Sequence, residues 1–301
     1  MATPACTPDK PSCLAYDAIV FVHGIYGGAK TFTNSATGFD WPSNFPPRGQ
    51  LYPFSNTVDL FRLNYRTALL SWAKADNPDF AEVARHVFKA LYPLRQRRYA
   101  TIGFIAHSLG GNIVFTYLTM VVDRLGHSYL AQNAFVITLA TPVVGAEIAD
   151  IAHLLKGLLG INDKLLTSLE NNNLYLRMLQ IFVQEARGKG GAFGCRPLDL
   201  HAAIETKHIG PLLVVSPTSA ALPIADAVNS PIIGFDRNHM EMATPSGTDD
   251  ELYKWVLARV TSEYARLHDW GLAHLDKTGV PQRCRSDEGW PSEPNGGANP
   301  F

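Results

Sequence analysis

Residues 103–111 read GFIAHSLGG, and this stretch decides the fold. An apolar run at residues 101–106 leads into it, and apolar residues at helical spacing follow over residues 112–125. The pattern predicts a strand, a sharp turn and a helix, with Ser108 at the apex of the turn. The strained backbone of such a serine requires small residues two positions away on each side, and here these are an alanine and a glycine. The stretch is therefore interpreted as a nucleophile elbow, with alanine in place of the first glycine of G-x-S-x-G.

An elbow of this kind lifts the Ser108 hydroxyl clear of the sheet. It also places the amide of Leu109 at the N-terminus of the helix, where the amide can donate a hydrogen bond to a developing oxyanion. The alternative interpretation is a glycine-rich turn that contains a serine by chance, because short motifs recur in unrelated sequences.

A second segment joins a strand to a glycine-rich loop. Residues 18–22, AIVFV, form a continuous apolar run typical of a buried parallel strand, and HGIYGG follows at residues 23–28. A His-Gly pair in this position resembles the oxyanion loop of lipases and esterases. The donor would then be the amide of Ile25, and His23, Gly24 and Tyr26 would lie against the substrate. A phosphate-binding loop is the weaker alternative, because the spacing GxxxxGK[ST] does not occur here.

The third segment supplies a general base. Residues 230–235 predict a short strand, and DRNHMEM follows at residues 236–242. In enzymes with a nucleophile elbow, the histidine of the triad follows the serine in the chain and lies in the loop after the last strand. His239 has this position and is therefore the candidate base. The pKa of imidazole lies near neutrality, which lets the ring accept the Ser108 proton and return it to a leaving group.

The acid that should orient His239 is less clearly marked. The strand before the histidine strand is predicted at residues 211–216, and no carboxylate follows it until Asp226. Glu147 is a second candidate, because it follows the predicted strand at residues 135–139. Asp226 is preferred. The alternative for Asp226 is a helix residue or a solvated loop charge, and the alternative for Glu147 is an ordinary first-turn acid of a helix. If neither serves, a water or the hydroxyl of Ser219 would take the role.

Three motifs together carry a family resemblance: FVHG at residues 21–24, AHSLGG at 106–111 and NHMEM at 238–242. They resemble the α/β-hydrolase superfamily, and within it the serine esterases and lipases related to the GPI inositol-deacylase and SERAC groups. The resemblance covers roughly residues 16–268. It implies an α/β fold, a mostly parallel sheet with helices on both faces, and hydrolysis of acyl esters through an acyl-serine intermediate.

Three functions are compatible with these motifs. The first is a serine carboxylester hydrolase with the catalytic residues Ser108, His239 and Asp226. The second is a catalytically silent α/β-hydrolase scaffold or binding module, which the missing acid at the usual position makes plausible. The third is an acyltransferase or thioesterase that uses the same Ser-His pair.

Composition agrees with a globular enzyme. Among 301 residues, 46% are hydrophobic and 18% are charged, and the formal net charge is -1. This balance gives no electrostatic reason to expect nucleic acid, and the expected partner is a small-molecule or lipid ester, with peripheral contact with lipid allowed. No apolar run reaches transmembrane length, no cofactor or metal is expected, and four cysteines lie without metal-ligand spacing. No signal peptide is visible, so a cytoplasmic location is expected, or secretion if the sequence is already processed.

The chain is predicted to contain one main domain. Its parts are an N-terminal extension (1–15), the hydrolase domain (16–276), and a loosely held C-terminal tail (277–301). Within the domain, residues 148–200 are predicted to form a helical cap over the serine, or else helices packed on the sheet without a gating role. Other expected elements are a strand at 57–63, helices at 80–94 and 249–270, and a long irregular loop at 29–55 where substrate would approach.

Overall fold

In the computed structural model, the described residues form a sheet of six parallel strands in the order β2-β1-β3-β4-β5-β6. Their bounds are β1 Asp17–Val22, β2 Val58–Leu63, β3 Thr101–His107, β4 Asn133–Leu139, β5 Asp199–Glu205 and β6 Ile233–Phe235. The structure describes residues 17–24, 27–28, 30–46, 58–64, 85–91, 94, 99, 101–125, 133–142, 198–208, 215 and 232–273.

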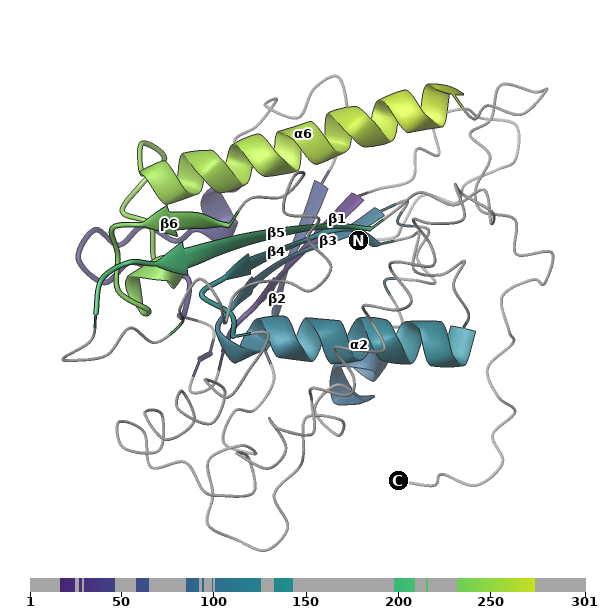
Figure 1. Ribbon diagram of the computed structural model, residues 1–301, viewed down its shortest axis with the longest axis horizontal. Helices are drawn as coiled ribbons and strands as arrows, with labels where there is room; N and C mark the ends of the chain where they lie inside the picture. The colour runs from purple at the N-terminus through teal and green to yellow at the C-terminus, as the bar shows by residue number, and fades with distance from the viewer. Residues whose placement is uncertain are drawn as a thin grey trace, which may run out of the picture.

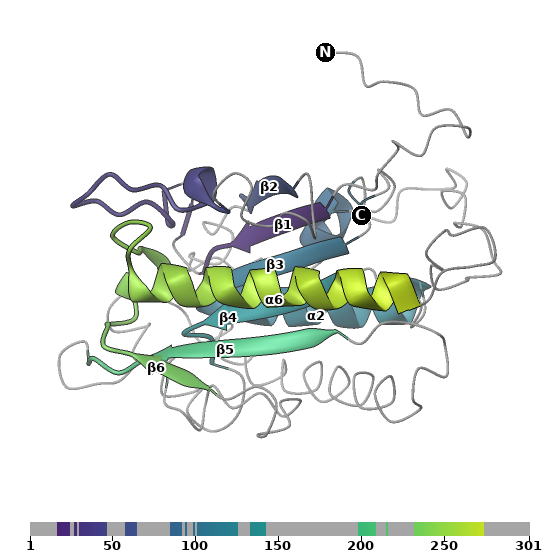
Figure 2. The ribbon, with the colours of Figure 1, turned by 90° about the horizontal axis from the view of Figure 1, so that it is seen from above.

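Helices cover both faces of the sheet. Helix α2 (Leu109–Leu125) lies beneath it and helix α6 (Glu251–Ala273) lies above it (Figure 1). Seen from above, α6 runs across the middle strands, with α2 behind them (Figure 2). The predicted fold class, an α/β fold with a mostly parallel sheet between helices, is confirmed.

The strands that flank the predicted elbow are buried along their whole length. Every residue of β1 and of β3 is buried, as expected for parallel strands covered by helices on both faces. Between the sheet and α6, aliphatic and aromatic side chains from β1, β3 and β4 pack with one apolar face of the helix. This packing explains why both runs were recognisable from the sequence as continuous apolar stretches.

The register of the strands brings several chain segments to one edge of the sheet. Val22 at the end of β1 pairs with Ala106, and His107 at the end of β3 pairs with Leu139. Farther along the sheet, Glu205 at the end of β5 pairs with Phe235 at the end of β6. Because all the strands are parallel, the residues that follow their carboxyl ends meet at this edge, where α/β proteins place their ligand sites.

The segment between β1 and β2 is more ordered than the irregular loop predicted at residues 29–55. In its described part, residues 30–46, a bridge joins Thr33 to Asp40 and a short 3₁₀ helix spans Pro42–Asn44. Its aromatic side chains Phe32, Trp41 and Phe45 are buried, and Phe39 is partly buried. They make edge-to-face contacts with one another, with Phe21 of β1 and with Tyr253 of α6. The hydroxyl of Tyr253 also donates to the carbonyl of Asn44 at 2.6 Å. The loop is therefore part of the core beside β1.

A buried polar network joins β5 to α6. The Nε2 atom of His201 lies 2.9 Å from Oε1 of Glu263, and Arg266 bridges Glu263 and Asp199. Buried polar groups need such partners, because an unpaired one is costly to desolvate. The network fixes β5 against the helix, and therefore fixes the position of the residue at the end of β5.

Other predicted segments fall largely or wholly outside the described residues. These are the extension 1–15, the tail 277–301, all four cysteines, and residues 148–197 of the predicted cap. The last two residues of the predicted cap range, Asp199 and Leu200, belong to β5. Of the strand predicted at residues 211–216, only Val215 is described, and it lies in a bend. Among the described residues, no helix is both long and apolar enough to cross a membrane.

Candidate functional site

Ser108 stands between the end of β3 and the start of α2 in the conformation that the elbow predicts. Its φ angle is 55°, in the left-handed region that a non-glycine residue rarely adopts. Its amide donates to the carbonyl of Leu139 at 2.9 Å, and its own carbonyl accepts from the hydroxyl of Thr141 at 2.8 Å and from the amide of Gly111 at 3.1 Å. These three hydrogen bonds hold the strained turn in place, as stored strain at a functional site requires.

The loop after β1 packs directly on the elbow through two glycines. A Cβ atom on Gly24 would lie 2.7 Å from Cβ and 3.1 Å from Oγ of Ser108. A Cβ atom on Gly110 would lie 2.6 Å from the carbonyl oxygens of both Val22 and His23. Only glycine permits these approaches, so both residues are needed for the loop and the serine to touch.

His239 follows β6 and reaches the serine from the other side. Its Nε2 atom lies 3.0 Å from Oγ of Ser108, within hydrogen-bond reach, and both side chains are buried. The structure thus brings together two residues that are 131 positions apart in the chain.

The second ring nitrogen of His239 faces Glu205, the last residue of β5. Its Nδ1 lies 3.3 Å from Oε1 of Glu205, whose side chain is 0% exposed. A carboxylate oxygen only accepts, so Nδ1 carries the proton and Nε2 is left free to accept from the serine hydroxyl. The amide of Val215 donates to the same Oε1 at 2.7 Å and holds the carboxylate in position.

Glu205 is not among the predicted acids, because the sequence pattern predicts residues 211–216 as the strand before the histidine strand. In the structure, β5 is the strand that pairs with β6, and Glu205 is its last residue. The preferred acid, Asp226, and the alternative, Glu147, both lie outside the described residues, as does Ser219. The available signal was the run LHAAIE at residues 200–205, a strand-length apolar stretch that ends in a carboxylate.

The predicted oxyanion donors are only partly described. Leu109 is the first residue of α2, where backbone N–H groups have no partner within the helix. Ile25 and Tyr26 lie outside the described residues. Gly24, which precedes them, is in contact distance of Ser108, as its lack of space for a Cβ demonstrates.

His23 packs against the backbone of the loop that follows β1. Its Nδ1 donates to the carbonyl of Gly24 at 2.8 Å, and a Cβ on Gly27 would lie 2.6 Å from the same nitrogen. Burial lowers the pKa of His23, and this outweighs the hydrogen bond to Gly24, which acts in the opposite direction. The ring is therefore neutral at neutral pH, and its described contacts are those of a side chain that positions the loop.

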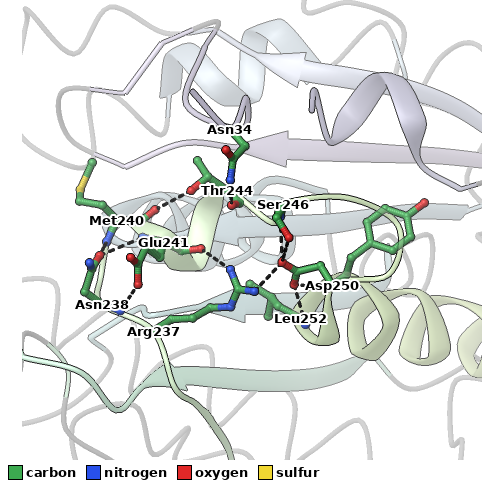
Figure 3. A network of polar contacts seen from close by, with 10 residues as sticks. Asn34, Arg237, Asn238, Met240, Glu241, Thr244, Ser246, Asp250 and Leu252 are labelled. Atoms are coloured by element: carbon green, nitrogen blue, oxygen red, sulfur yellow. Dashed lines mark hydrogen bonds and ion pairs between the residues drawn. The ribbon is translucent and has the colours of Figure 1, made fainter. Parts of the chain in front are cut away.

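The loop that carries His239 is fixed by its own side chains (Figure 3). The Oδ1 atom of Asn238 accepts from the amides of Met240 and Glu241, at 3.0 and 3.1 Å. In return, the carboxylate of Glu241 accepts from the amide of Asn238 at 2.9 Å. This reciprocal pattern is that of a capping box, here around the 3₁₀ helix Glu241–Ala243. It leaves the backbone of His239 little freedom.

An ion pair anchors the same loop to α6. Arg237 contacts the carbonyl of Glu241 and pairs with Asp250, whose Oδ1 accepts from the amides of Leu252 and Tyr253 at the start of α6 (Figure 3). Burial alone would raise the pKa of Asp250. Hydrogen bonds from Ser246 and Arg237, together with the positive charge of Arg237, outweigh burial and leave the pKa lowered.

Replacing Asp250 with asparagine tests this anchor. Asparagine caps a helix about as well as aspartate, so Asp250→Asn removes mainly the charge. We expect the free energy of unfolding at pH 7 to fall by about 1–3 kcal/mol. Since the folded pKa is lowered, the carboxylate stabilises the protein above its unfolded pKa of about 3.9, and this contribution is lost as the pH falls through the folded value. Urea unfolding of both proteins should give a difference that shrinks below about pH 4, and a difference constant down to about pH 2 would contradict the assignment.

In the part of the chain that the structure describes, no group of three or more His, Cys, Asp or Glu side chains is arranged as metal ligands would be. At the carboxyl ends of the strands, Ser108 contacts His239, and His239 in turn contacts the carboxylate of Glu205.

Comparisons with known proteins identify the fold. No protein-family model and no curated protein match the sequence. Among solved structures, the chain is similar to the mature form of the lipase BlEst2 of Bacillus licheniformis, with a TM-score of 0.51 and 17% identity over 82% of this chain and 93% of that one. Two further matches have lower TM-scores. A monoacylglycerol lipase of Paleococcus ferrophilus has 0.42, with 13% identity over 82% and 94% of the two chains. A lipase-esterase related protein of Clostridium acetobutylicum has 0.41, with 15% identity over 82% and 93%. The strand order and the match to BlEst2 together show that the protein has the α/β-hydrolase fold.

Proposed function

We propose that the protein is a serine carboxylester hydrolase, esterase- or lipase-like, that cleaves acyl esters through an acyl-serine intermediate. One observation carries the proposal: Oγ of Ser108 lies 3.0 Å from Nε2 of His239, while Nδ1 of the same ring faces the buried carboxylate of Glu205. These are the roles of nucleophile, general base and orienting acid in a catalytic triad. Glu205 replaces Asp226 in the proposal.

The reaction follows from these contacts. As Oγ of Ser108 attacks the carbonyl carbon of the ester, its proton passes to Nε2 of His239, and Glu205 stabilises the resulting imidazolium. The tetrahedral intermediate collapses when His239 returns the proton to the leaving alcohol, which leaves the acyl group on the serine. A water molecule then attacks the acyl-serine, again with His239 as base, and releases the carboxylic acid and the free serine.

The developing oxyanion needs donors on the side of α2. We assign this role to the amide of Leu109, which is supported by its place as the first residue of the helix, and to the amide of Ile25. The tight contact of Gly24 with Ser108 supports the second donor, because it brings the loop that leads to Ile25 against the serine.

An exposed apolar side chain next to His239 in the sequence supports a substrate with hydrocarbon character. Met240 is adjacent to His239 and is 63% exposed, and it is the exposed large hydrophobic residue among those described. The part of the predicted cap range that precedes β5, residues 148–197, is proposed to supply the acyl pocket as a cap. The resemblance to the GPI inositol-deacylase and SERAC groups stays a prediction.

The test is a hydrolysis assay with p-nitrophenyl esters of graded chain length, run with and without prior treatment by a fluorophosphonate. We expect the untreated protein to hydrolyse at least one of these esters and the treated protein to be inactive. A folded protein that hydrolyses none of the esters and does not react with the fluorophosphonate would favour the silent scaffold. A protein that reacts with the probe and hydrolyses only thioesters would favour the thioesterase.

Gly24→Ala should damage catalysis, because the added methyl group would displace Ser108 or the loop by a substantial fraction of an ångström. A misplacement of about 1 Å can lower a rate by about 10²-fold, and we expect a fall in kcat of this order. Gly28→Ala is the matched control in the same loop, because its Cβ would meet no atom within 4 Å. Equal kcat values for the two variants in the ester assay would argue against close contact between this loop and the serine.

A further inference from the structure

His107 is a buried titratable group that the proposed reaction does not use. It ends β3 and immediately precedes Ser108, and its side chain is buried. Because side chains alternate along a strand, His107 lies on the same face of the sheet as Ile105, the face that packs against α6. The loop that carries His239 connects β6 to α6 at the carboxyl end of the sheet (Figure 1).

The ring of His107 contacts the backbone of the proposed base. Its Nε2 lies 2.8 Å from the carbonyl oxygen of His239, and a carbonyl only accepts, so Nε2 of His107 carries a proton and donates it. The two imidazole rings lie side by side, with centroids 5.0 Å apart. Among the described residues, two hydrogen-bond contacts join residues 107–111 to the loop 236–243. One is the contact of Ser108 with the His239 ring, and the other is this hydrogen bond from His107.

The lowered pKa of His107 keeps its ring neutral while the ring donates to the His239 carbonyl. Burial lowers its pKa to about 3, helped by the nearby rings of His239 and His23 and opposed by the hydrogen bond to His239. The ring therefore stays neutral at working pH. A neutral ring does not repel the imidazolium that His239 would become during acyl transfer, whereas a charged ring at this distance would.

We infer that His107 is a positioning residue, which ties the loop of His239 to the nucleophile elbow through the hydrogen bond from its Nε2 to the His239 carbonyl. This inference rests on the proposed function. Other anchors of the loop join it to itself, to α6 and to the end of β5. These are the Asn238–Glu241 box, the Arg237–Asp250 pair, and the contacts of Glu205 and of the Lys207 amide with the loop. In the part of the chain that the structure describes, the hydrogen bond from His107 is the one that joins the loop to the last residue of β3, next to the nucleophile.

Two substitutions separate the hydrogen bond from the volume of the ring. His107→Phe keeps a planar ring but has no donor. His107→Gln places an amide N–H2 about where Nε2 stands and can restore the hydrogen bond. In the ester assay we expect His107→Phe to lower kcat by about 10- to 100-fold with KM changed less than about threefold, because the geometry of proton transfer suffers while substrate binding does not. His107→Gln should recover most of that loss.

The outcomes are distinguishable from a failure of the proposed function. If the wild-type protein neither hydrolyses esters nor reacts with a fluorophosphonate, the proposed function fails. If the wild type is active and His107→Phe matches it, or if folded His107→Gln is as slow as folded His107→Phe, the positioning role is wrong. Circular dichroism and thermal unfolding establish that each variant is folded.

A spectroscopic measurement keeps the inference testable if His107→Phe does not fold. In the wild-type protein labelled with ¹⁵N-histidine, the signals of His107 can be assigned by their loss in His107→Gln. We expect a neutral ring protonated on Nε2 at every pH from about 5 to 9, because its pKa lies far below the ordinary value of 6.5. Titration near the ordinary value, or a proton on Nδ1, would overturn the inference.

Discussion

Ser108→Ala is expected to lower the turnover of a p-nitrophenyl ester by about 10⁴-fold or more, because the proposed acyl-enzyme forms on the Ser108 hydroxyl. The backbone should tolerate the change, since the three hydrogen bonds that hold the elbow come from main-chain atoms of residue 108 and not from its hydroxyl. Steady-state kinetics and thermal unfolding of the purified variant check both expectations.

Ser43→Ala is the matched control. Ser43 is exposed, lies in the segment between β1 and β2, and is distant in sequence from every residue of the proposed triad. Its replacement should leave the turnover number within about twofold of the wild type, as is usual for a surface position. A folded Ser108→Ala variant with more than about one hundredth of the wild-type activity would contradict the role of Ser108 as nucleophile.

Glu205→Gln is expected to lower kcat by about 10³- to 10⁴-fold, by analogy with the Asp-to-Asn substitution in the serine-protease triad. An amide carries no charge to stabilise the imidazolium that His239 becomes during acyl transfer. Because the amide of Val215 can still donate to the Oε1 atom of the new side chain, we expect the fold to persist. The measurement is kcat in the ester assay.

Asp226→Asn and Glu147→Gln make the comparison decisive, since these were the acids that the sequence suggested. In the present account each should leave kcat within about threefold of the wild type. If Asp226→Asn lowered kcat by about 10³-fold and Glu205→Gln did not, the acid would be Asp226, and the contact between Glu205 and His239 would be structural.

The sequence predicted the elements that are recognisable from local patterns. Strands β1 and β3 are continuous apolar runs because helices cover both faces of the sheet, and the elbow has small residues where the turn requires them. His239 could be predicted as the candidate base because it follows a recognisable last strand, and β6 is short but ends at Phe235.

Glu205 could not be recognised in the same way, because the stability of β5 comes from partners far along the chain. Its histidine, His201, is paired by Glu263 of α6, 62 residues later, so a polar residue is accommodated in a buried strand. The run LLVVS at residues 212–216 is more apolar and looked like the better strand. Choosing it moved the expected acid from the end of β5 to Asp226.

For a similar reason, the sequence between β1 and β2 predicts only an irregular loop. Its aromatic residues show no period, because they pack on Phe21 of β1 and on Tyr253 of α6 and not on a face of their own. The order of residues 30–46 is tertiary in origin, and no local pattern encodes it.

The most direct measurement is to identify the residue that a fluorophosphonate modifies, by mass spectrometry of a tryptic digest. Residues 99–124 form one tryptic peptide that contains Ser108. We predict a single adduct on Ser108 in the wild-type protein, no adduct in Ser108→Ala, and a rate of modification at least about 10²-fold lower in His239→Ala, because the serine then lacks its base. A folded wild-type protein that stays unmodified, or that carries the adduct on a different residue, would contradict the account.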